Sequence, residues 1–423
     1  MEENVSKYTN AVGSGKQAIT QRQKRKGGRG MREGWEYKTF GEVGTFLRGK
    51  SIQKADFVEH GLPCIHYGQI HTKFGVSVNK HLSEIPEEIY NKSIIASPGD
   101  IVIAITSEDL EGSCKSTAWL GDYDVAVSSH AAVYKHNLNP KFIAYYLRSN
   151  SFYIEKEKYA RGFKVMEIKP TDIARIPIPV PSEIIQSRVV SELDKINELI
   201  RLKKEQLKDY DNLAQSIFYE MFGDPVVNEK GWDNSTIESV CSSIVRGPFG
   251  SALKKEFFVE PTNDTYKVYE QKHAIQKNHI IGSYYITKEK FQELRRFEVF
   301  PGDIIMSCSG TIGEFYQIPK EAEKGVMNQA LLKFTLNENR TTTEFFMFLM
   351  NFIKNSFETK GTGLQNIGSV KVIKSTILGL PPLPLQQTFA QRIELIEKQK
   401  AEVQRTIADL ETLLASRMQY WFD

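Results

Sequence analysis

The sequence is poor in cysteine, has no long hydrophobic run and carries little net charge. Its four cysteines stand far apart without a C-x-x-C pair, which argues against a disulfide framework and against a structural zinc site. No apolar segment is long enough to cross a membrane, and the N-terminus is polar and basic rather than signal-like. A net charge of +3 leaves the question of acidic partners to the distribution of the charges. We therefore expect a cytoplasmic protein that does not contact membranes.

The residue constellations of common enzymes are also missing. The sequence has no Pro-Asp dipeptide to begin a nuclease pattern, no Asn-Pro-Pro-aromatic segment and no glycine-rich turn suited to S-adenosylmethionine. Its eight histidines are scattered without H-E-x-x-H spacing. The one dense acidic cluster, Glu108, Asp109 and Glu111, is interpreted as a solvated loop. We expect neither a catalytic site nor a metal site in this chain.

One segment does match a nucleotide-binding motif. Residues 44–51 fit the pattern G-x-x-x-x-G-K-[ST] letter for letter. A phosphate-binding loop needs a buried strand before it, small residues that expose the backbone N–H groups, and a helix behind it. Here Phe46, Leu47 and Arg48 are bulky, and the second half of the chain keeps an Arg-Gly pair but loses Gly-Lys-Ser. We therefore interpret the match as coincidental.

What the sequence does contain is an internal repeat of about 200 residues. Its length of 423 residues suits two or three domains. Five short motifs of the first half return in the same order in the second half. They pair Gly34-Trp35 with Gly231-Trp232, Phe46–Ser51 with Ile244–Ser251, Tyr67–Gln69 with Tyr269–Gln271, Pro98–Val102 with Pro301–Ile305, and Pro179–Pro181 with Pro382–Pro384. The chain is therefore predicted to be two copies of one unit.

Each copy combines a domain of short strands with one long helix. Strand-like runs such as Asp100–Ile105 and Asp303–Met306 are separated by Gly and Pro turns, and one amphipathic helix pattern interrupts each domain, around Pro140–Leu147 and Thr343–Met350. This pattern predicts the α+β class. The expected parts are a disordered, basic N-terminal extension with few apolar side chains at 1–30, a first domain at 31–182, a long helix at 183–223, a second domain at 224–385 and a second long helix at 386–423.

Both long helices carry apolar residues at alternating spacings of four and three, which is typical of coiled coils. Gly223 and Pro225 are expected to end the first helix. An ordinary surface helix is the alternative, but the length of the pattern, far above that of an average helix, favours two helices that pair. The pairing residues are Val189, Leu193, Ile196, Ile200, Leu207 and Ile217 in the first helix, and Phe389, Ile393, Ile396, Val403, Ile407, Leu410, Leu414 and Trp421 in the second.

Polar and basic loops occur at equivalent places in both copies. Arg and Lys supply phosphate contacts, whereas Gln, Asn and Arg bond to base edges. Loops of many α+β proteins have this composition, so a coiled-coil scaffold with two peptide- or ligand-binding domains remains the alternative. The candidate DNA-binding residues are Arg48, Lys50, Tyr67, Gln69, His71, Lys73, Arg161 and Lys164 in the first copy, and Arg246, Ser251, Lys254, Lys255, Gln271, Lys272, Lys360, Gln365 and Asn366 in the second.

In this order the motifs resemble the specificity subunits of Type I restriction–modification systems. The resemblance covers residues 31–423 and also rests on Asn328–Ala330, where the first copy has Ser129–Ala131. It implies that each domain reads one half of a split double-stranded DNA target. It further implies that the helices pair antiparallel and dock two adenine-methyltransferase subunits, which motor-nuclease subunits then join. S-adenosylmethionine, ATP and Mg²⁺ would belong to those partners, with no cofactor in this chain.

Overall fold

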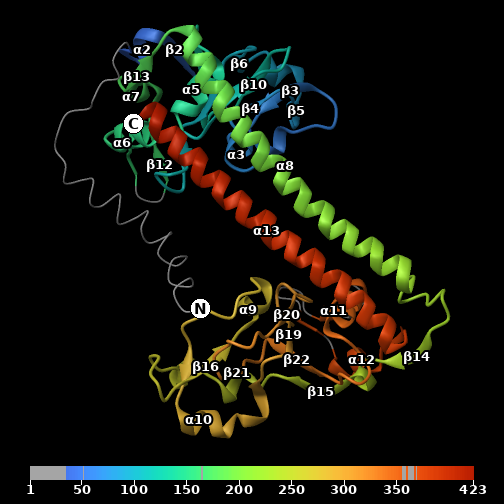
Figure 1. Cartoon of the computed structure of the whole chain (residues 1–423). Helices are drawn as coiled ribbons and strands as arrows, with labels where there is room; N and C mark the ends of the chain where they lie inside the picture. The colour runs from blue at the N-terminus through green and yellow to red at the C-terminus, as the bar shows by residue number, and fades with distance from the viewer. Residues whose placement is uncertain (1–34, 51, 163–164, 355–358, 361–365, 368) are drawn as a thin grey trace. The chain divides into compact units, whose positions relative to one another are not determined.

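The computed structural model describes residues 35–423 except 51, 163–164, 355–358, 361–365 and 368. The chain forms two compact units, and Figure 1 labels their elements. The first contains the residues up to Ile200 together with Asp409–Asp423, and the second contains Arg201–Ala408. Each unit therefore includes one domain and a stretch of both long helices.

The first unit is built on two mixed sheets. The larger has the order β2 (Gly44–Arg48), β11 (Ala131–His136), β7 (Ile101–Ala104), β9 (Ser116–Trp119) and β4 (Ser77–Val78). The smaller has the order β5 (Ser83–Ile85), β3 (Leu62–Ile65), β10 (Val125–Val127) and β6 (Ile94–Ala96). Two short pairs join β1 (Glu36–Thr39) to β13 (Pro177–Val180) and β8 (Thr106–Ser107) to β12 (Met166–Glu167). The helices are α2 (Phe40–Val43), α3 (Tyr67–Thr72), α4 (Glu87–Tyr90), α5 (Pro140–Tyr146), α6 (Asn150–Glu157) and α7 (Pro170–Ile173).

The second unit repeats the core of this topology, although its described residues contain no counterpart of β4 or of the β8–β12 pair. One sheet has the order β15 (Cys241–Arg246), β22 (Leu331–Leu336), β19 (Ile304–Ser307) and β20 (Phe315–Gln317), and the other has β17 (Tyr285–Ile286), β16 (Tyr266–Tyr269), β21 (Gly325–Met327) and β18 (Glu298–Val299). The short pairs are β14 (Asp233–Thr236) with β25 (Ile377–Leu380) and β23 (Thr359–Lys360) with β24 (Asn366–Ile367). The helices are α9 (Gln271–Ile275), α10 (Lys288–Glu293), α11 (Thr343–Ile353) and α12 (Val370–Ser375). The predicted repeat and the α+β class are confirmed.

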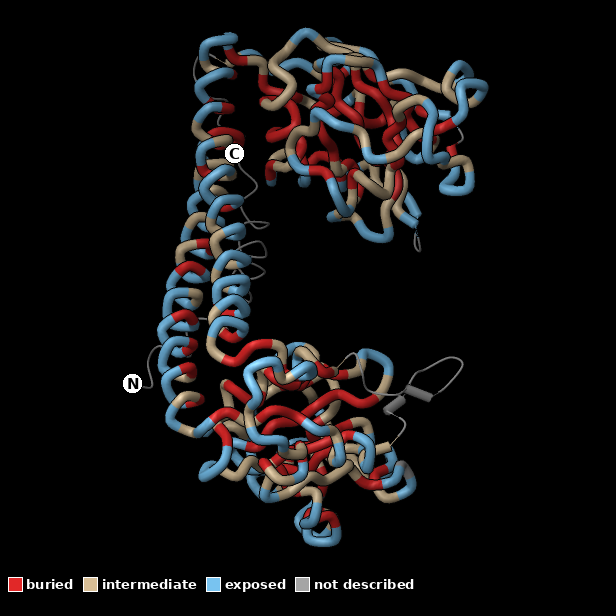
Figure 2. Tube along the Cα trace, turned by 90° about the vertical axis from the view of Figure 1, so that its right-hand side faces the viewer, coloured by how far each residue is buried: buried red, intermediate tan, exposed pale blue. Residues whose placement is uncertain are grey.

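The central strands are buried on both faces, as Figure 2 shows for the interior of each unit. Along β7, Ile101 and Ile103 pack with α5, whereas Val102 and Ala104 pack against the smaller sheet. Successive side chains of a strand point to opposite faces, so a strand covered on both sides needs a continuous apolar run. This explains why the runs after each Pro-Gly-Asp are apolar throughout.

The Pro-Gly-Asp motif itself is a turn that starts these strands. Gly99 and Gly302 have φ angles of 96° and 92°, a region that favours glycine. The following aspartate folds back, so that the Asp100 carboxylate accepts a hydrogen bond from the Ser97 N–H at 2.7 Å. The Asp303 carboxylate accepts the equivalent bond from the Phe300 N–H at 2.8 Å. The motif therefore serves the fold in both copies.

The two long helices are α8 (Glu183–Phe222) and α13 (Leu383–Phe422), each of 40 residues. Helix α13 begins three residues before the expected position, because Pro384 falls in its first turn, where proline is tolerated. Helix α8 ends as predicted at Gly223, which has a φ of 72° and donates its N–H to the Tyr219 carbonyl at 2.9 Å.

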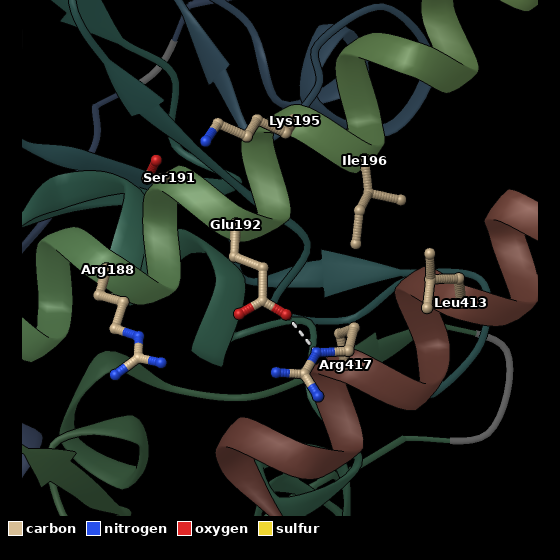
Figure 3. Close-up of a pocket in the computed structure, with 7 residues that line it drawn as sticks. All are labelled: Arg188, Ser191, Glu192, Lys195, Ile196, Leu413 and Arg417. Atoms are coloured by element: carbon tan, nitrogen blue, oxygen red, sulfur yellow. Dashed lines mark hydrogen bonds and ion pairs between the residues drawn. The ribbon is translucent and has the colours of Figure 1, made fainter.

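Within each unit the two helices run antiparallel. In the first unit Glu192 pairs with Arg417, and Ile196 lies beside Leu413, as Figure 3 shows. In the second unit the ammonium of Lys400 lies 2.8 Å from the Asp211 carboxylate, and the Phe218 and Phe389 rings are 5.5 Å apart. Later residues of α8 thus meet earlier residues of α13, as an antiparallel coiled coil requires.

The buried stripe drifts along these helices relative to the predicted heptads. Leu207 and Ile217 are half-buried, while Phe218 and Phe222 are fully buried and pack on α11. A straight helix has 3.6 residues per turn, so positions spaced every 3.5 residues rotate gradually away from the contact face. The residues that stay buried are therefore found slightly later in the sequence than the strict heptad predicts. Residues of the predicted set that are buried are Val189, Leu193, Ile196, Ile200, Phe389, Ile393, Ile396, Val403, Ile407 and Trp421, whereas Leu410 and Leu414 are half-buried.

The described residues contain no candidate membrane span and no candidate metal site. None of the described helices combines the length and the apolar character that a membrane span needs. Within the same part of the chain, no group of three or more His, Cys, Asp and Glu side chains is arranged to hold a metal ion.

Candidate nucleic-acid interface

In the first domain the predicted loops converge on the turn Ser128–His130, which follows β10. Lys50 forms an isolated β-bridge with Ser128. The Nε atom of Arg48 donates to the Ser129 carbonyl at 3.5 Å. The Tyr67 N–H, at the start of α3, donates to the Ser128 hydroxyl at 3.0 Å. We call Arg48, Lys50, Tyr67, His71 and Ser128–His130 the first loop cluster.

An aromatic group lies in the first loop cluster. The Tyr67 ring centroid is 4.5 Å from that of His66, 4.9 Å from that of His130 and 6.2 Å from that of His71. Thr106 links two of these rings, because its hydroxyl lies 3.1 Å from Nδ1 of His130 and its carbonyl 3.1 Å from Nε2 of His71. Tyr67 and His71 are half-buried and His130 is exposed. Burial, with the charges of Lys54 and His130, lowers the pKa of His66, whose Nδ1 accepts the Gly68 N–H.

A hairpin borders the cluster. The backbone of Arg161 pairs with that of Glu167, and the Glu167 carboxylate lies 3.1 Å from the Arg48 guanidinium. The Arg161 guanidinium lies 3.7 Å from the Asp172 carboxylate. Lys164, between the two arms, lies outside the described residues. Lys73 is exposed at the end of α3.

Gln69 serves the fold rather than presenting its amide to a ligand. Its Oε1 accepts the His66 N–H at 3.0 Å, and its Nε2 donates to the Ser83 hydroxyl at 2.7 Å. Both ends of the amide are therefore bonded inside the domain, where they cap α3 and attach it to β5. The hypothesis that Gln69 reads a base is not favoured by this geometry.

The second domain has the same arrangement around the turn Asn328–Ala330, which follows β21. The Nε atom of Arg246 donates to the Gln329 carbonyl at 3.0 Å. The Asn328 N–H donates to the Tyr269 carbonyl at 2.9 Å, just before α9 starts at Gln271. We call Arg246, Gln271 and Asn328–Ala330 the second loop cluster.

Strand pairing corrects the match between Tyr67–Gln69 and Tyr269–Gln271. Ile65 pairs with Val127 in the first domain, and Tyr269 pairs with Met327 in the second. Tyr269 is therefore the counterpart of Ile65, and it is fully buried. The chain between the Arg-Gly pair and this strand is longer in the second copy, so that a shared tyrosine letter misaligned the two segments.

With this register, Gln271 takes the place of Tyr67, and His273 takes the place of Gln69. Nδ1 of His273 accepts the Glu270 N–H at 2.8 Å, just as Gln69 accepts that of His66. Burial lowers the pKa of His273, which favours the neutral ring that can accept this bond.

Two further sequence matches are shifted. The Gly49 N–H donates to the Ala131 carbonyl and the Gly247 N–H to the Leu331 carbonyl, so Ser128–His130, not Ser129–Ala131, corresponds to Asn328–Ala330. Before the long helices, Nε2 of Gln186 donates to the Pro181 carbonyl and Nε2 of Gln386 to the Pro381 carbonyl. Pro181 therefore corresponds to Pro381 rather than to Pro384. In both cases an identical residue type close to the structural counterpart shifted the sequence match.

The Arg-Gly pair is required by close packing in both domains. A Cβ atom on Gly49 would lie 2.1 Å from the Ser128 carbonyl oxygen, and one on Gly247 would lie 1.8 Å from that of Asn328. The preceding residues of the nucleotide-binding pattern form strand β2, paired along its length with β11. A strand in this position cannot wrap around a phosphate, which agrees with the interpretation of the match as coincidental.

The remaining candidates of the second domain lie in three places. Ser251, Lys254 and Lys255 are exposed in a segment that packs near α10, where the Lys290 ammonium lies 4.1 Å from the Phe257 ring centroid. Lys272 lies 2.6 Å from the Glu270 carboxylate. Lys360 pairs with Asn366 between β23 and β24; their side chains, and all of Gln365, lie outside the described residues.

A groove of about 480 Å³ lies between α8 and α13 in the first unit (Figure 3). The Glu192 carboxylate on its floor accepts hydrogen bonds from Nε of Arg417 and from Nε1 of Trp421, the latter at 3.2 Å. The bond from Arg417, with that from Trp421, holds the pKa of Glu192 below its usual value. Arg188 and Lys195 add positive charge to the rim.

Two repeated α+β domains, each followed by a long helix of an antiparallel pair, define a class of doubled recognition proteins. The chain belongs to the family of Type I restriction–modification DNA specificity domains, whose model matches residues 32–209 and 229–412.

Curated relatives and a solved structure agree with this family. The chain is 21% identical over 391 residues to the specificity subunit of the Type I restriction enzyme StySPI from Salmonella potsdam, with 86% of this chain and 82% of that one covered. It is 26% identical over 192 residues to the MjaVIII specificity subunit from Methanocaldococcus jannaschii, which covers 44% of each chain. A solved structure from work on the assembly of a type I R-M system has the same fold, with a TM-score of 0.63 at 17% identity over 93% of this chain and 99% of that one.

Proposed function

We propose that this chain reads a bipartite, asymmetric target in double-stranded DNA, one half-site per domain, and has no catalytic site of its own. The observation that carries the proposal is the pair of loop clusters. Each is held by the same Arg-Gly contact and the same turn, yet the side chains that they expose differ. One frame with two sets of exposed side chains is what two readers of different sequences need.

The chemistry of the exposed side chains suits a duplex. Lys50 and Lys73 are exposed and suited to phosphates, which position a protein on DNA without reading sequence. Base edges in the major groove are distinguished by amide, guanidinium and hydroxyl groups, and the half-buried Gln271 and Tyr67 supply two of these. In the first domain the pair of Arg161 and Glu167 borders the cluster, where the Glu167 carboxylate lies 3.1 Å from the Arg48 guanidinium.

We further propose that α8 and α13 dock two adenine-methyltransferase subunits, which motor-nuclease subunits join. S-adenosylmethionine, ATP and Mg²⁺ act in those partners. Several large apolar side chains of the helices are exposed although the pairing stripe is filled, and a partner subunit that covered them would remove this apolar surface from water. They include Leu199, Leu202, Leu213, Leu395, Leu413 and Tyr420, with exposed fractions of 45–63%.

An exchange of domains tests the proposal. Residues 31–182 would be replaced by the equivalent domain of another family member, and methylated adenines would be mapped in cells that also produce the methyltransferase. We expect one half-site to change and the other to stay. A change of both half-sites, or a continuous palindromic target, would contradict the proposal. If the purified complex binds no duplex at all, the alternative of a scaffold that joins two peptide- or ligand-binding domains is favoured.

A further inference from the structure

Some positions of the two loop clusters use their side chains in the same way in both domains. Nε of Arg48 and of Arg246 bonds to the carbonyl at the centre of the turn. Gln69 and His273 both accept the N–H group that precedes their helix by one position. Because these polar atoms are bonded within the protein in both copies, the positions form the frame that holds the turn and the helix.

Other positions of the clusters differ and serve no shared bond. At the first residue of the helix, the first domain has Tyr67 and the second has Gln271. At the last residue of the turn, the first has His130, which lies against Tyr67, and the second has Ala330. Where the first domain has two aromatic rings at these positions, the second therefore has a carboxamide and a methyl group.

The carboxamide of Gln271 is poised for a ligand. Its Oε1 is buried and has no hydrogen-bond partner within the described part of the chain. A buried polar group without a partner is costly, and native proteins pair the large majority of their buried side-chain polar atoms. A base edge that offers both a donor and an acceptor would satisfy the amide, and glutamine pairs in this bidentate way with N6 and N7 of adenine.

We infer that Tyr67 and Gln271 are equivalent specificity-determining residues, with Gln271 selecting adenine in one half-site and Tyr67, supported by His130, selecting a base pair in the other. The inference rests on the proposed function and assigns one reading position in each domain. It excludes Gln69 and His273, whose side chains cap the helices.

The test is a selection of bound duplexes from a library of randomised sequence, with the full chain in its methyltransferase complex. The wild-type complex defines the two half-sites. Gln271→Met keeps the length of the side chain but removes its hydrogen bonds. We expect it to lose the preference for adenine at one position by roughly 5- to 150-fold, the ratio that corresponds to one bidentate pair.

Gln271→Glu supplies a sharper readout. A carboxylate accepts a hydrogen bond from N4 of cytosine, so we expect the preferred base at that position to change from adenine to cytosine. Tyr67→Leu should alter one position of the other half-site only. Gln276→Glu makes the same chemical change at the exposed end of α9 and should leave both half-sites as they are.

The outcomes distinguish a failure of the proposed function from a failure of the residue assignment alone. A wild-type complex that selects no sequence refutes the proposed function. A wild-type complex that selects a bipartite target, with unchanged base preference in the Gln271→Met complex, refutes the inference alone. The same holds if either Gln271 variant alters the half-site that Tyr67→Leu alters. Should Gln271→Glu fail to assemble, the methionine variant decides, because it adds no charge.

Discussion

Gly49→Ala should displace the turn Ser128–His130 of the first loop cluster without changing any side chain that we propose to contact DNA. A Cβ atom at this position would lie 2.1 Å from the Ser128 carbonyl oxygen and 2.6 Å from that of Val127. Ordinary contact needs at least 3.4 Å, so the turn must move by about 1 Å or more. Backbone atoms cannot rotate away as a long side chain can. Overpacking of this kind costs about 1–3 kcal/mol.

The displaced segment, Ser128–His130, contacts Tyr67 through the Ser128 hydroxyl and the His130 ring. We therefore expect two effects: a lower free energy of unfolding, measured in urea, and weaker base preference in one half-site, measured by duplex selection. Gly75→Ala is the matched control, because a Cβ atom there meets nothing within 4 Å. If Gly49→Ala matches Gly75→Ala in stability and selects the wild-type target, the close contact does not position the turn.

Three further changes have defined outcomes. Phe218→Ala removes a fully buried ring that packs on Phe345 and Phe389, so urea titration should show a loss of about 3–5 kcal/mol in the free energy of unfolding. The exposed Leu213→Ala should lose less than about 1 kcal/mol, and equal losses would contradict the assigned buried stripe. Burial lowers the pKa of His136 to about 4, whereas its value in the unfolded chain is 6.5. The folded protein therefore keeps the ring neutral, and stability is lost as pH falls from 6.5 towards 4, because only the unfolded chain takes up the proton in that range. Curves of stability against pH for His136→Gln should be flatter over this window by at most about 3 kcal/mol, and an unchanged slope would refute the assignment. Leu199→Asp should leave the melting temperature unchanged but reduce copurification with the methyltransferase, and full copurification would argue against docking at this surface. Leu193→Asp, at a fully buried position, should instead lower the melting temperature.

The architecture could be predicted from the sequence because it depends on patterns that repeat over many residues. Two long helices, the strands after each Pro-Gly-Asp and the helices α5 and α11 each occupy a run with a clear period or a clear turn. The register between the copies could not be predicted in the same way. It is set by strand pairing, such as that of Ile65 with Val127, and a loop of different length shifts a matching letter away from its structural counterpart.

The loops of the candidate interface were found from their composition, but the turns that hold them together were not. Ser128–His130 and Asn328–Ala330 contain few charged residues, so a search for basic loops passes over them. A signal that could have shown their role is the glycine after Arg48 and Arg246, since a glycine that returns in both copies indicates a close approach of two backbones. The partner of that approach is visible only in three dimensions.

Difference between the two copies is not sufficient evidence that a residue reads DNA. Gln69 and His273 differ in size, aromaticity and titration, yet both supply one acceptor to the same N–H group, and the fold requires nothing more. A frame position therefore changes freely as long as one atom of the right kind stays in place. A reading position is recognised by the opposite combination, in which the backbone is the same and no shared bond constrains the side chain. Tyr67 and Gln271 meet that criterion, and we therefore propose them as the positions where a change of side chain would change the target while the turn stays intact.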